Sequence, residues 1–173
     1  TTSAGLVLGV HAYLNPPTAA RWQVAGSYDL DILGFDPAPL DRLTRFVRER
    51  EGTPAHLRLL QLGAVASVMA LEPAAWWQDL GPAAVVPGFF EQPIRIFRVP
   101  DPLPRAYVVD GVRVADGEQA LRTLVDPSLD PRREIVLAEG EPRPPGTGPA
   151  GTARLSGQGW DAEEVDADLQ RDA

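Results

Sequence analysis

The sequence predicts an α+β protein: a mixed β-sheet with two to four helices packed on it, followed by the start of a smaller β-rich segment. Short apolar runs of strand length recur along the chain. Three stretches have the three- and four-residue apolar spacing of a helix, and 18 prolines fall between the periodic segments rather than within them. The length of 173 residues is enough for one domain, or one and a half, with a sizeable core.

The segment 94–109 is the predicted centre of the sheet. In its first half, 94–99, isoleucine and valine alternate with two arginines, with Phe97 breaking the alternation, so this half predicts a strand with one wet face. Its second half, 106–109, has no polar residue and predicts a strand buried on both faces in the middle of the sheet. Three prolines between the halves predict a rigid turn. Other apolar runs predict further strands, the first of them also central: 65–71, 5–14 and 135–138.

Three stretches predict amphipathic helices. The first begins with Asp36 as N-cap and Pro37 at the first helical position. Its apolar side chains fall on one side: Leu40, Leu43, Phe46 and Val47. The second, 53–63, has a threonine cap and a glycine terminator. The third, 116–125, starts with an aspartate cap and ends before an Asp-Pro pair, because the residue preceding a proline is pushed out of the helical region.

The segment 141–151 divides the predicted domains. It is rich in proline and glycine, which is typical of a flexible connector or exposed loop. Residues 1–140 are expected to form an α/β domain, and residues 152–173 the start of a truncated β-rich segment with two weak strands. Because the chain starts without an initiator methionine or a charged signal-peptide head, we expect a piece of a longer protein.

The charge balance excludes some partners. The chain has 24 acidic side chains against 16 basic ones, all arginine, and a formal charge of −8. Such a surface repels phosphate backbones, so nucleic acid is not expected as a partner. Cysteine is absent, which excludes disulfides and thiolate metal sites and leaves the compartment open. No run approaches 18 apolar residues, so no segment of this chain is predicted to span a bilayer.

Trp76 and Trp77 are the first candidate binding residues. They stand among prolines and a glycine in a predicted loop, where adjacent tryptophans can form a stacking platform for a sugar ring or a lipid headgroup. They can equally cap a hydrophobic core, which is the preferred interpretation.

Catalytic and metal-binding patterns are weak. The Asp-X-Asp triplets at 29–31 and 166–168 are of the kind that holds a divalent cation in nucleotide-sugar glycosyltransferases. With 24 acids in the chain such triplets are expected by chance, so no metal site is predicted. His11 is interpreted as a hydrogen-bonded strand residue and His56 as a surface helix residue, and their spacing suits neither a metal site nor a catalytic triad. No catalytic residue and no cofactor is assigned.

A series of segments in a fixed order carries a family resemblance. They are Asn15 followed by Gly34-Phe35-Asp36-Pro37, then Leu59-Leu60-Gln61-Leu62-Gly63-Ala64-Val65, then Ile94 to Phe97 with Leu103-Pro104-Arg105-Ala106, and finally Glu118 to Leu124 with Leu129-Asp130-Pro131. Over residues 5–140 the chain resembles the large extracytoplasmic region of YfhO-type bacterial multi-spanning membrane proteins, which are glycosyltransferase-like proteins of the GT-C type. The segment 103–106 is the most specific. The chain departs from the family pattern at Phe35, where tyrosine is usual.

The resemblance implies a location and a role. The chain is expected to be an extracytoplasmic domain in the cell envelope, attached to the membrane through segments absent from this chain and not catalytic by itself. In the family, the catalytic acid is expected in a loop near the first transmembrane helices, so no catalytic residue carries over. The implied partners are the transmembrane part of its own parent chain and a cell-surface glycan or lipid-linked sugar. The domain is expected to cover the membrane active site or to bind the acceptor glycan.

Four residues are candidates for binding that glycan: Trp76, Trp77, Tyr28 and Arg105. For Arg105 the competing interpretation is a contact with turn carbonyls or with a carboxylate such as Asp101. The alternative to the whole hypothesis is a free-standing soluble hydrolase that uses paired carboxylates near Asp29 and Asp31.

Overall fold

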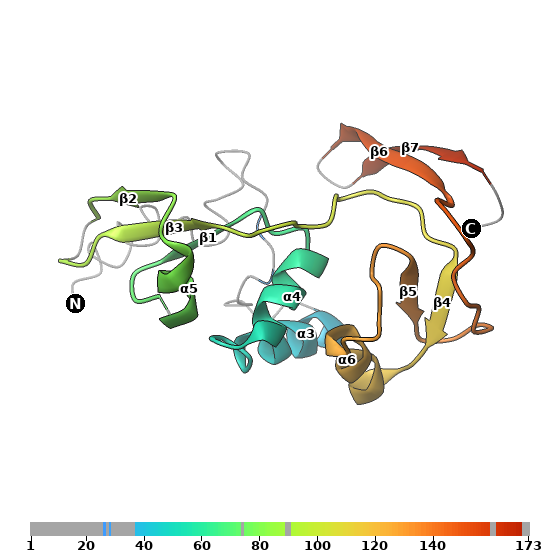
Figure 1. Cartoon of the computed structure of the whole chain (residues 1–173), viewed down its shortest axis with the longest axis horizontal. Coiled ribbons are helices and arrows are strands. Elements are labelled where there is room, and N and C mark those ends of the chain that lie inside the picture. Colours follow the sequence, from blue (N-terminus) through green and yellow to red (C-terminus); the bar gives the residue numbers. More distant parts are fainter. Residues whose placement is uncertain are drawn as a thin grey trace. The chain divides into compact units, whose positions relative to one another are not determined.

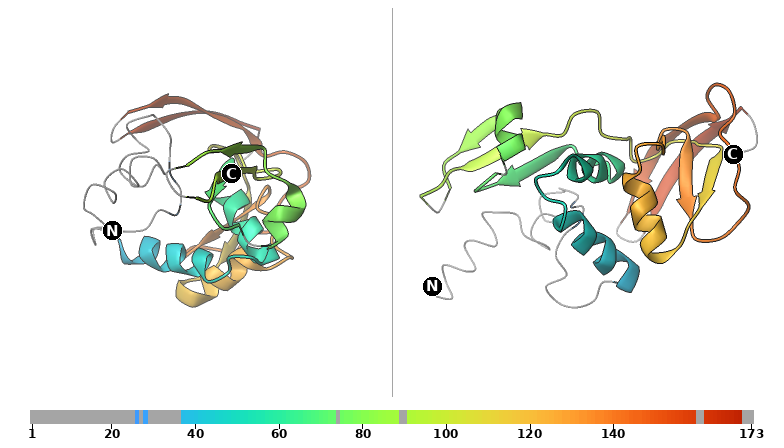
Figure 2. Two further views of the ribbon diagram at one scale, coloured as in Figure 1. Left: turned by 90° about the vertical axis from the view of Figure 1, so that its left-hand side faces the viewer. Right: turned by 60° about the horizontal axis from the view of Figure 1, so that its bottom comes forward.

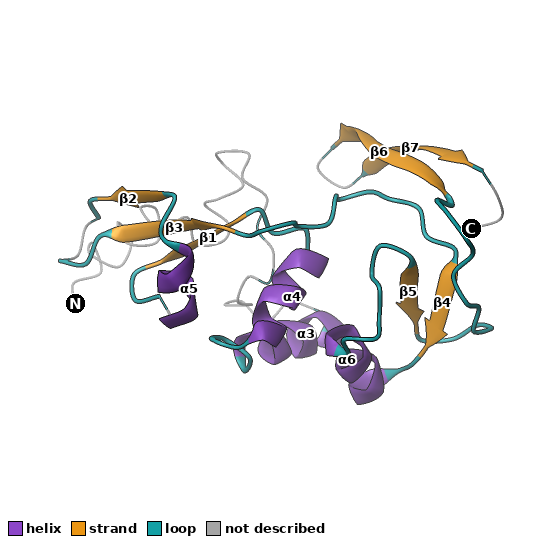
Figure 3. Cartoon of the chain, viewed as in Figure 1, coloured by secondary structure: helices purple, strands orange, loops and turns teal. Residues whose placement is uncertain are grey.

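The structure is a computed structural model that describes residues 26, 28, 37–73, 75–88, 91–159 and 162–170. The described residues contain four helices and several small sheets, which confirms the predicted α+β class (Figures 1 and 3). The chain divides into two compact units, unit 1 with residues 1–60 and 65–100 and unit 2 with residues 61–64 and 101–173. This division falls after Pro100, whereas the sequence placed a boundary at 140. The predicted strand 5–14, His11 and the triplet 29–31 lie outside the described residues.

Helix α3 (Ala38–Arg48) confirms the first predicted helix. It starts one residue late, because Pro37 is the N-cap rather than the first helical residue, and no side chain caps it. Asp36, the predicted cap, lies outside the described residues. Phe46 and Val47 are buried as predicted, whereas Leu40 is 42% exposed.

Helix α4 (Pro54–Leu62) confirms the second predicted helix, with the Thr53 hydroxyl accepting a hydrogen bond from the His56 backbone N–H at 3.4 Å. Gly63 was predicted to terminate this helix. The residue with the left-handed backbone conformation that commonly ends a helix is the next one, Ala64, with φ of 53°.

Three antiparallel strands form the sheet of unit 1, in the order β1 (Ser67–Ala70), β3 (Ile94–Arg98), β2 (Ala84–Val86). They are the green strands side by side in the right-hand view of Figure 2. The segment 65–71 was predicted to be a central strand, but among the described strands β1 lies at an edge of this sheet, and β3 has a partner on each side. Strand β3 is therefore the element around which the unit 1 sheet is built.

The buried face of β3 is the opposite of the predicted one. Phe97 is 1% and Val99 5% exposed, and Arg95 shares their side of the strand because side chains alternate with a period of two. Ile94 and Ile96 are only half-buried. The tryptophan of the short helix α5 (Ala75–Leu80) packs on Phe97, so Phe97, which broke the expected alternation, marks the core side.

The core of unit 1 combines residues from three elements. Leu60, Trp77, Phe97 and Val99 form its buried cluster, against which partly buried side chains pack, Tyr28 and Trp76 among them. Because burying one large apolar side chain is worth about 1.5–3 kcal/mol, this small cluster contributes several kcal/mol to the stability of unit 1.

Unit 2 contains a βαβ segment: β4 (Gly111–Val114), α6 (Gly117–Val125) and β5 (Glu134–Leu137), with β4 and β5 parallel (Figure 3). The Asp116 carboxylate accepts a hydrogen bond from the Gly117 N–H at 2.6 Å and Asp126 is the C-cap, so the predicted helix and both of its ends are confirmed.

The predicted buried strand at 106–109 was wrong. These residues form no strand, and Tyr107 is 40% exposed. The ladder starts at Gly111, whose N–H donates to the Arg133 carbonyl at 3.0 Å, because only from there does the chain run beside β5. Apolar composition made the segment look like a strand, but it has no pairing partner.

The two weak strands predicted at the end of the chain are present and pair with each other. They are β6 (Gly151–Gln158) and β7 (Glu163–Leu169), antiparallel with an irregularity between Leu155 and Gly157. The predicted connector 141–151 lies within unit 2, where Arg143 forms an isolated bridge with Val112.

Candidate functional site

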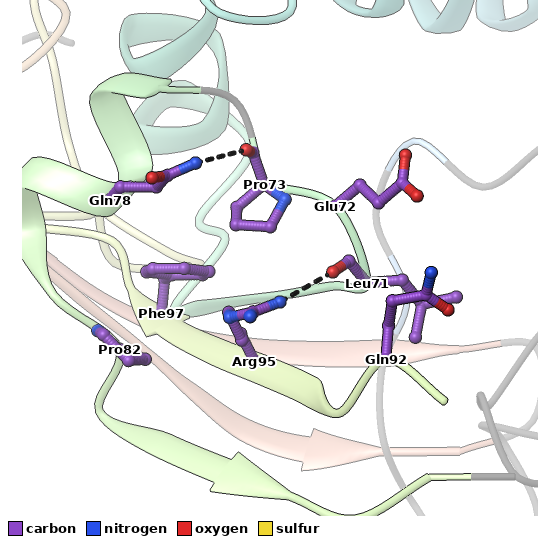
Figure 4. A pocket seen from close by; sticks show the side chains of 8 residues that line it. All are labelled: Leu71, Glu72, Pro73, Gln78, Pro82, Gln92, Arg95 and Phe97. Atoms are coloured by element: carbon purple, nitrogen blue, oxygen red, sulfur yellow. Dashed lines mark hydrogen bonds between the residues drawn. The ribbon is translucent and has the colours of Figure 1, made fainter. Parts of the chain in front are cut away.

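A cavity of about 500 Å³ lies against the sheet of unit 1 (Figure 4). Three stretches of chain supply its lining: the turn between β1 and α5, the segment from α5 to the start of β2, and the segment 92–97 that includes β3. The lining residues are Leu71, Glu72, Pro73, Gln78, Pro82, Gln92, Arg95 and Phe97. Its volume lies in the range of roughly 300–1,000 Å³ that is usual for small-molecule sites.

Arg95 supplies the positive charge of this cavity. It lies in the central strand, opposite Ala70 of β1 and Val85 of β2, so its backbone is fixed from both sides. Its Nη1 donates a hydrogen bond to the Leu71 carbonyl at 2.9 Å (Figure 4). The side chain is half-buried, and none of the ion pairs found among the described residues includes it.

Uncharged amides and one carboxylate add to the polar lining. The Gln78 side-chain amide donates to the Pro73 carbonyl at 3.3 Å, which orients its amide group, and Gln92 is exposed. Figure 4 shows the Glu72 carboxylate pointing away from the Arg95 guanidinium. Amides can both donate and accept hydrogen bonds, so the site offers both kinds of group to a ligand.

The apolar part of the lining is continuous with the core. Phe97 lines the cavity, and its ring centroid lies 5.5 Å from that of Trp77 at an angle of 42°. Pro73 and Pro82 add rigid apolar surface that needs no ordering of side-chain rotamers. The cavity therefore has walls that are already held in place by the packing of unit 1.

Trp76 and Trp77 lie on helix α5, not in the predicted loop. Their rings stack with centroids 4.1 Å apart and an angle of 29°. Trp77 is 2% exposed, which confirms the core interpretation for this residue, and Trp76 is half-buried. Neither lines the cavity, although Gln78, the next residue, does.

His56 was predicted at the surface, and this was wrong, because it is 8% exposed. Its ring meets Trp76 and Trp77 edge-on, at centroid distances of 6.2 and 6.4 Å. Burial lowers the pKa of His56, and Arg48 lowers it further while Glu51 opposes both. Among the described residues, neither His56 Nδ1 nor Trp76 Nε1 has a hydrogen-bond partner.

Tyr28, another predicted binding residue, also belongs to this core. Its hydroxyl donates to the Leu59 carbonyl at 2.8 Å, and burial raises the pKa of Tyr28 to about 12. The phenol is therefore neutral at physiological pH and engaged as a donor within unit 1.

Arg105, the fourth predicted binding residue, lies in unit 2 and forms an ion pair with Glu163 of β7. A carboxylate partner had been expected for it, with Asp101 as the example. Tyr28, Trp76 and Trp77 are thus brought together by one core, whereas Arg105 belongs to the other unit. A glycan-binding role for these four residues stays a prediction.

Metal-ligating groups are not gathered in the described ranges. No set of three histidine, aspartate or glutamate side chains there could hold an ion. In the triplet 166–168, Asp166 pairs with Arg154 at 3.0 Å.

The residues that sequence reasoning missed are Gln78, Gln92 and Arg95. One signal for Arg95 was present in the sequence. Arg95 and Phe97 are two residues apart in a short strand, so their side chains lie on the same face of the sheet, and an arginine is expected beside the largest apolar residue of that strand. The glutamines carried no such signal, because their meeting depends on the fold.

No family model, curated protein or solved structure matches this chain. In the part of the chain that the structure describes, no helix has both the length and the apolar character needed to cross a membrane.

Proposed function

We propose that this chain is a non-catalytic, extracytoplasmic glycan-binding domain of a membrane-anchored glycosyltransferase-like protein, and that the sugar binds in the cavity against β3. The observation that supports it best is the mixed lining, in which amide and guanidinium groups stand beside a phenylalanine and two prolines.

This mixture suits the two kinds of surface that a sugar ring presents. Its hydroxyl groups both donate and accept, as the Gln78 and Gln92 amides do. Its C–H faces are apolar and pack on rings, which Phe97, Pro73 and Pro82 provide. A rigid lining also reduces the entropy lost on binding.

The proposed membrane attachment and cell-envelope location are supported by the resemblance over residues 5–140, with Leu103-Pro104-Arg105-Ala106 as its most specific segment. The partners proposed on this basis are the transmembrane part of the parent chain and a cell-surface glycan or lipid-linked sugar. The test is to sequence the gene on both sides of this segment. Apolar spans of about 20 residues are expected there, and a reading frame without any would contradict the attachment.

Glycan binding is tested with an array of bacterial cell-surface polymers followed by calorimetric titration of the best ligand. Gln78→Ala and Gln92→Ala should each weaken binding about tenfold, because one hydrogen bond to a ligand is worth about 1–1.5 kcal/mol. Gln119→Ala is the matched control, since Gln119 is exposed on α6 of unit 2. Binding that neither cavity variant weakens would remove the cavity from the proposal, and the absence of binding to any glycan would remove the glycan.

A further inference from the structure

Arg95 occupies a place where a strand would ordinarily present an apolar side chain. Its face of β3 is the one that buries Phe97, and helix α5 covers that face beside it. A cation on the core side of a central strand loses part of its hydration, which is costly unless another group supplies negative charge or hydrogen bonds.

The hydrogen bonds that the described residues offer compensate little of that cost. A guanidinium has five N–H donors, and among the described residues the hydrogen-bond partner of Arg95 is one carbonyl oxygen, that of Leu71. No carboxylate of the described residues forms an ion pair with it. The nearest candidate in the lining, Glu72, directs its carboxylate elsewhere in Figure 4.

Other half-buried arginines of the chain are satisfied differently. Arg113 of β4 donates to both carboxylate oxygens of Glu134 and to the hydroxyl and carbonyl of Ser128. Arg95 differs from Arg113 in having no carboxylate partner among the described residues, and it lines the cavity against the unit 1 sheet. A ligand in that cavity can supply the negative charge.

We infer that the glycan bound in this cavity carries a carboxylate, as uronic acids do, and that Arg95 binds this carboxylate. The inference rests on the proposed glycan-binding function and names the class of sugar. The planar fork of a guanidinium matches the two oxygens of a carboxylate, and such charge-assisted pairs are about twice as strong as neutral hydrogen bonds.

The charge count favours a carboxylate over a phosphate. Among the described residues of the lining, Arg95 is the one cation, and the other polar side chains are two amides and the carboxylate of Glu72. Because Glu72 offsets the charge of Arg95 in the lining, a ligand carboxylate leaves about one uncompensated negative charge in the cavity. A phosphate monoester brings about 1.5–2 negative charges at neutral pH and would leave a larger excess, in a protein that is already at −8.

The experiment measures binding of matched probes to the whole chain by calorimetry. The probes are the methyl glycosides of glucuronate and galacturonate, the neutral methyl esters of the same two sugars, and glucose 6-phosphate. The wild-type chain should bind at least one acid tenfold or more tightly than its ester. Arg95→Gln should abolish that preference, and raising the salt concentration should reduce it in the wild type.

Arg98→Gln is the matched control, because Arg98 lies three residues further along the same strand, is exposed, and projects from the opposite face. It should keep the full preference. Arg95→Lys keeps the charge but not the planar fork and should keep only part of the preference. Melting curves of all variants show which ones fold, and Arg95→Lys decides the question if Arg95→Gln does not.

The outcomes separate this inference from the function on which it rests. Equal binding of acid and ester overturns the carboxylate and leaves glycan binding intact, and tighter binding of the sugar phosphate does the same. Binding of neither acid nor ester overturns the uronic acid, and the array of cell-surface polymers then decides whether the chain binds glycans at all. An acid preference that survives in Arg95→Gln removes Arg95 as the residue responsible, and one that survives at full strength in Arg95→Lys removes the planar fork as the basis of the preference.

Discussion

The stacked residues Trp76 and Trp77 allow one substitution to be compared at two neighbouring positions that differ in burial. Trp77 is 2% exposed and contacts Trp76, His56 and Phe97, whereas Trp76 is half-buried. If the core is as described, Trp77→Ala should destabilise unit 1 far more than Trp76→Ala.

The expected size follows from burial. Replacing a fully buried tryptophan by alanine costs about 3–5 kcal/mol, through lost transfer free energy and the cavity left behind. For a half-buried tryptophan we expect about half of that, roughly 2 kcal/mol. In a folding unit of under 100 residues, 1 kcal/mol shifts the melting temperature by about 4–8 °C. Trp77→Ala should therefore lower the melting temperature by about 12–40 °C and Trp76→Ala by about 8–16 °C.

The assay is urea and thermal unfolding followed by circular dichroism, which does not depend on the tryptophans being removed. Because domains are stable by only about 5–15 kcal/mol, Trp77→Ala is best measured at low temperature, and Trp77→Phe serves as a milder variant. If Trp76→Ala lowers the free energy of unfolding as much as Trp77→Ala does, or more, the assignment of Trp77 to the centre of the core is refuted.

Three further substitutions test single contacts. Burial lowers the pKa of His56 below 6.5, so the unfolded chain binds the proton more readily. The contribution of His56 to stability is therefore complete above pH 6.5 and lost as the pH falls, and melting curves from pH 4 to 8 should show a flatter pH dependence of the melting temperature in His56→Phe. Tyr28→Phe should cost about 1 kcal/mol in urea unfolding and remove the absorbance step near pH 12. The contribution of Tyr28 is present below pH 10 and lost as the pH rises towards 12, so an absorbance step near pH 10 that Tyr28→Phe removes would contradict its burial. Gly111→Ala would bring its Cβ within 2.8 Å of the Arg133 carbonyl oxygen and should cost about 1–3 kcal/mol, and unchanged urea unfolding would mean that β4 and β5 lie further apart.

The sequence was most informative where the structure depends on neighbours in the chain. The aspartate cap at 116 and the Asp-Pro stop at 126–127 define helix α6, because capping and the proline restriction act within a few residues. The two final strands, β6 and β7, were likewise predicted from local alternation, whereas their pairing with each other was not.

Errors arose where burial and pairing depend on distant segments. The apolar run 106–109 meets no strand, and an apolar composition cannot show which residues find a partner. His56 looked like a surface residue because the two tryptophans that cover it lie twenty residues further along the chain. The cavity could not be predicted for the same reason, since its lining joins three stretches that only the fold brings together.

Phe97 belongs at once to the hydrophobic cluster of unit 1 and to the wall of the cavity. Occupancy and folding are consequently linked: a molecule that binds only the folded form raises the melting temperature by mass action, by an amount set by its concentration relative to its dissociation constant. A thermal-shift screen of unlabelled compounds can thus find ligands for this domain without any assumption about their chemistry.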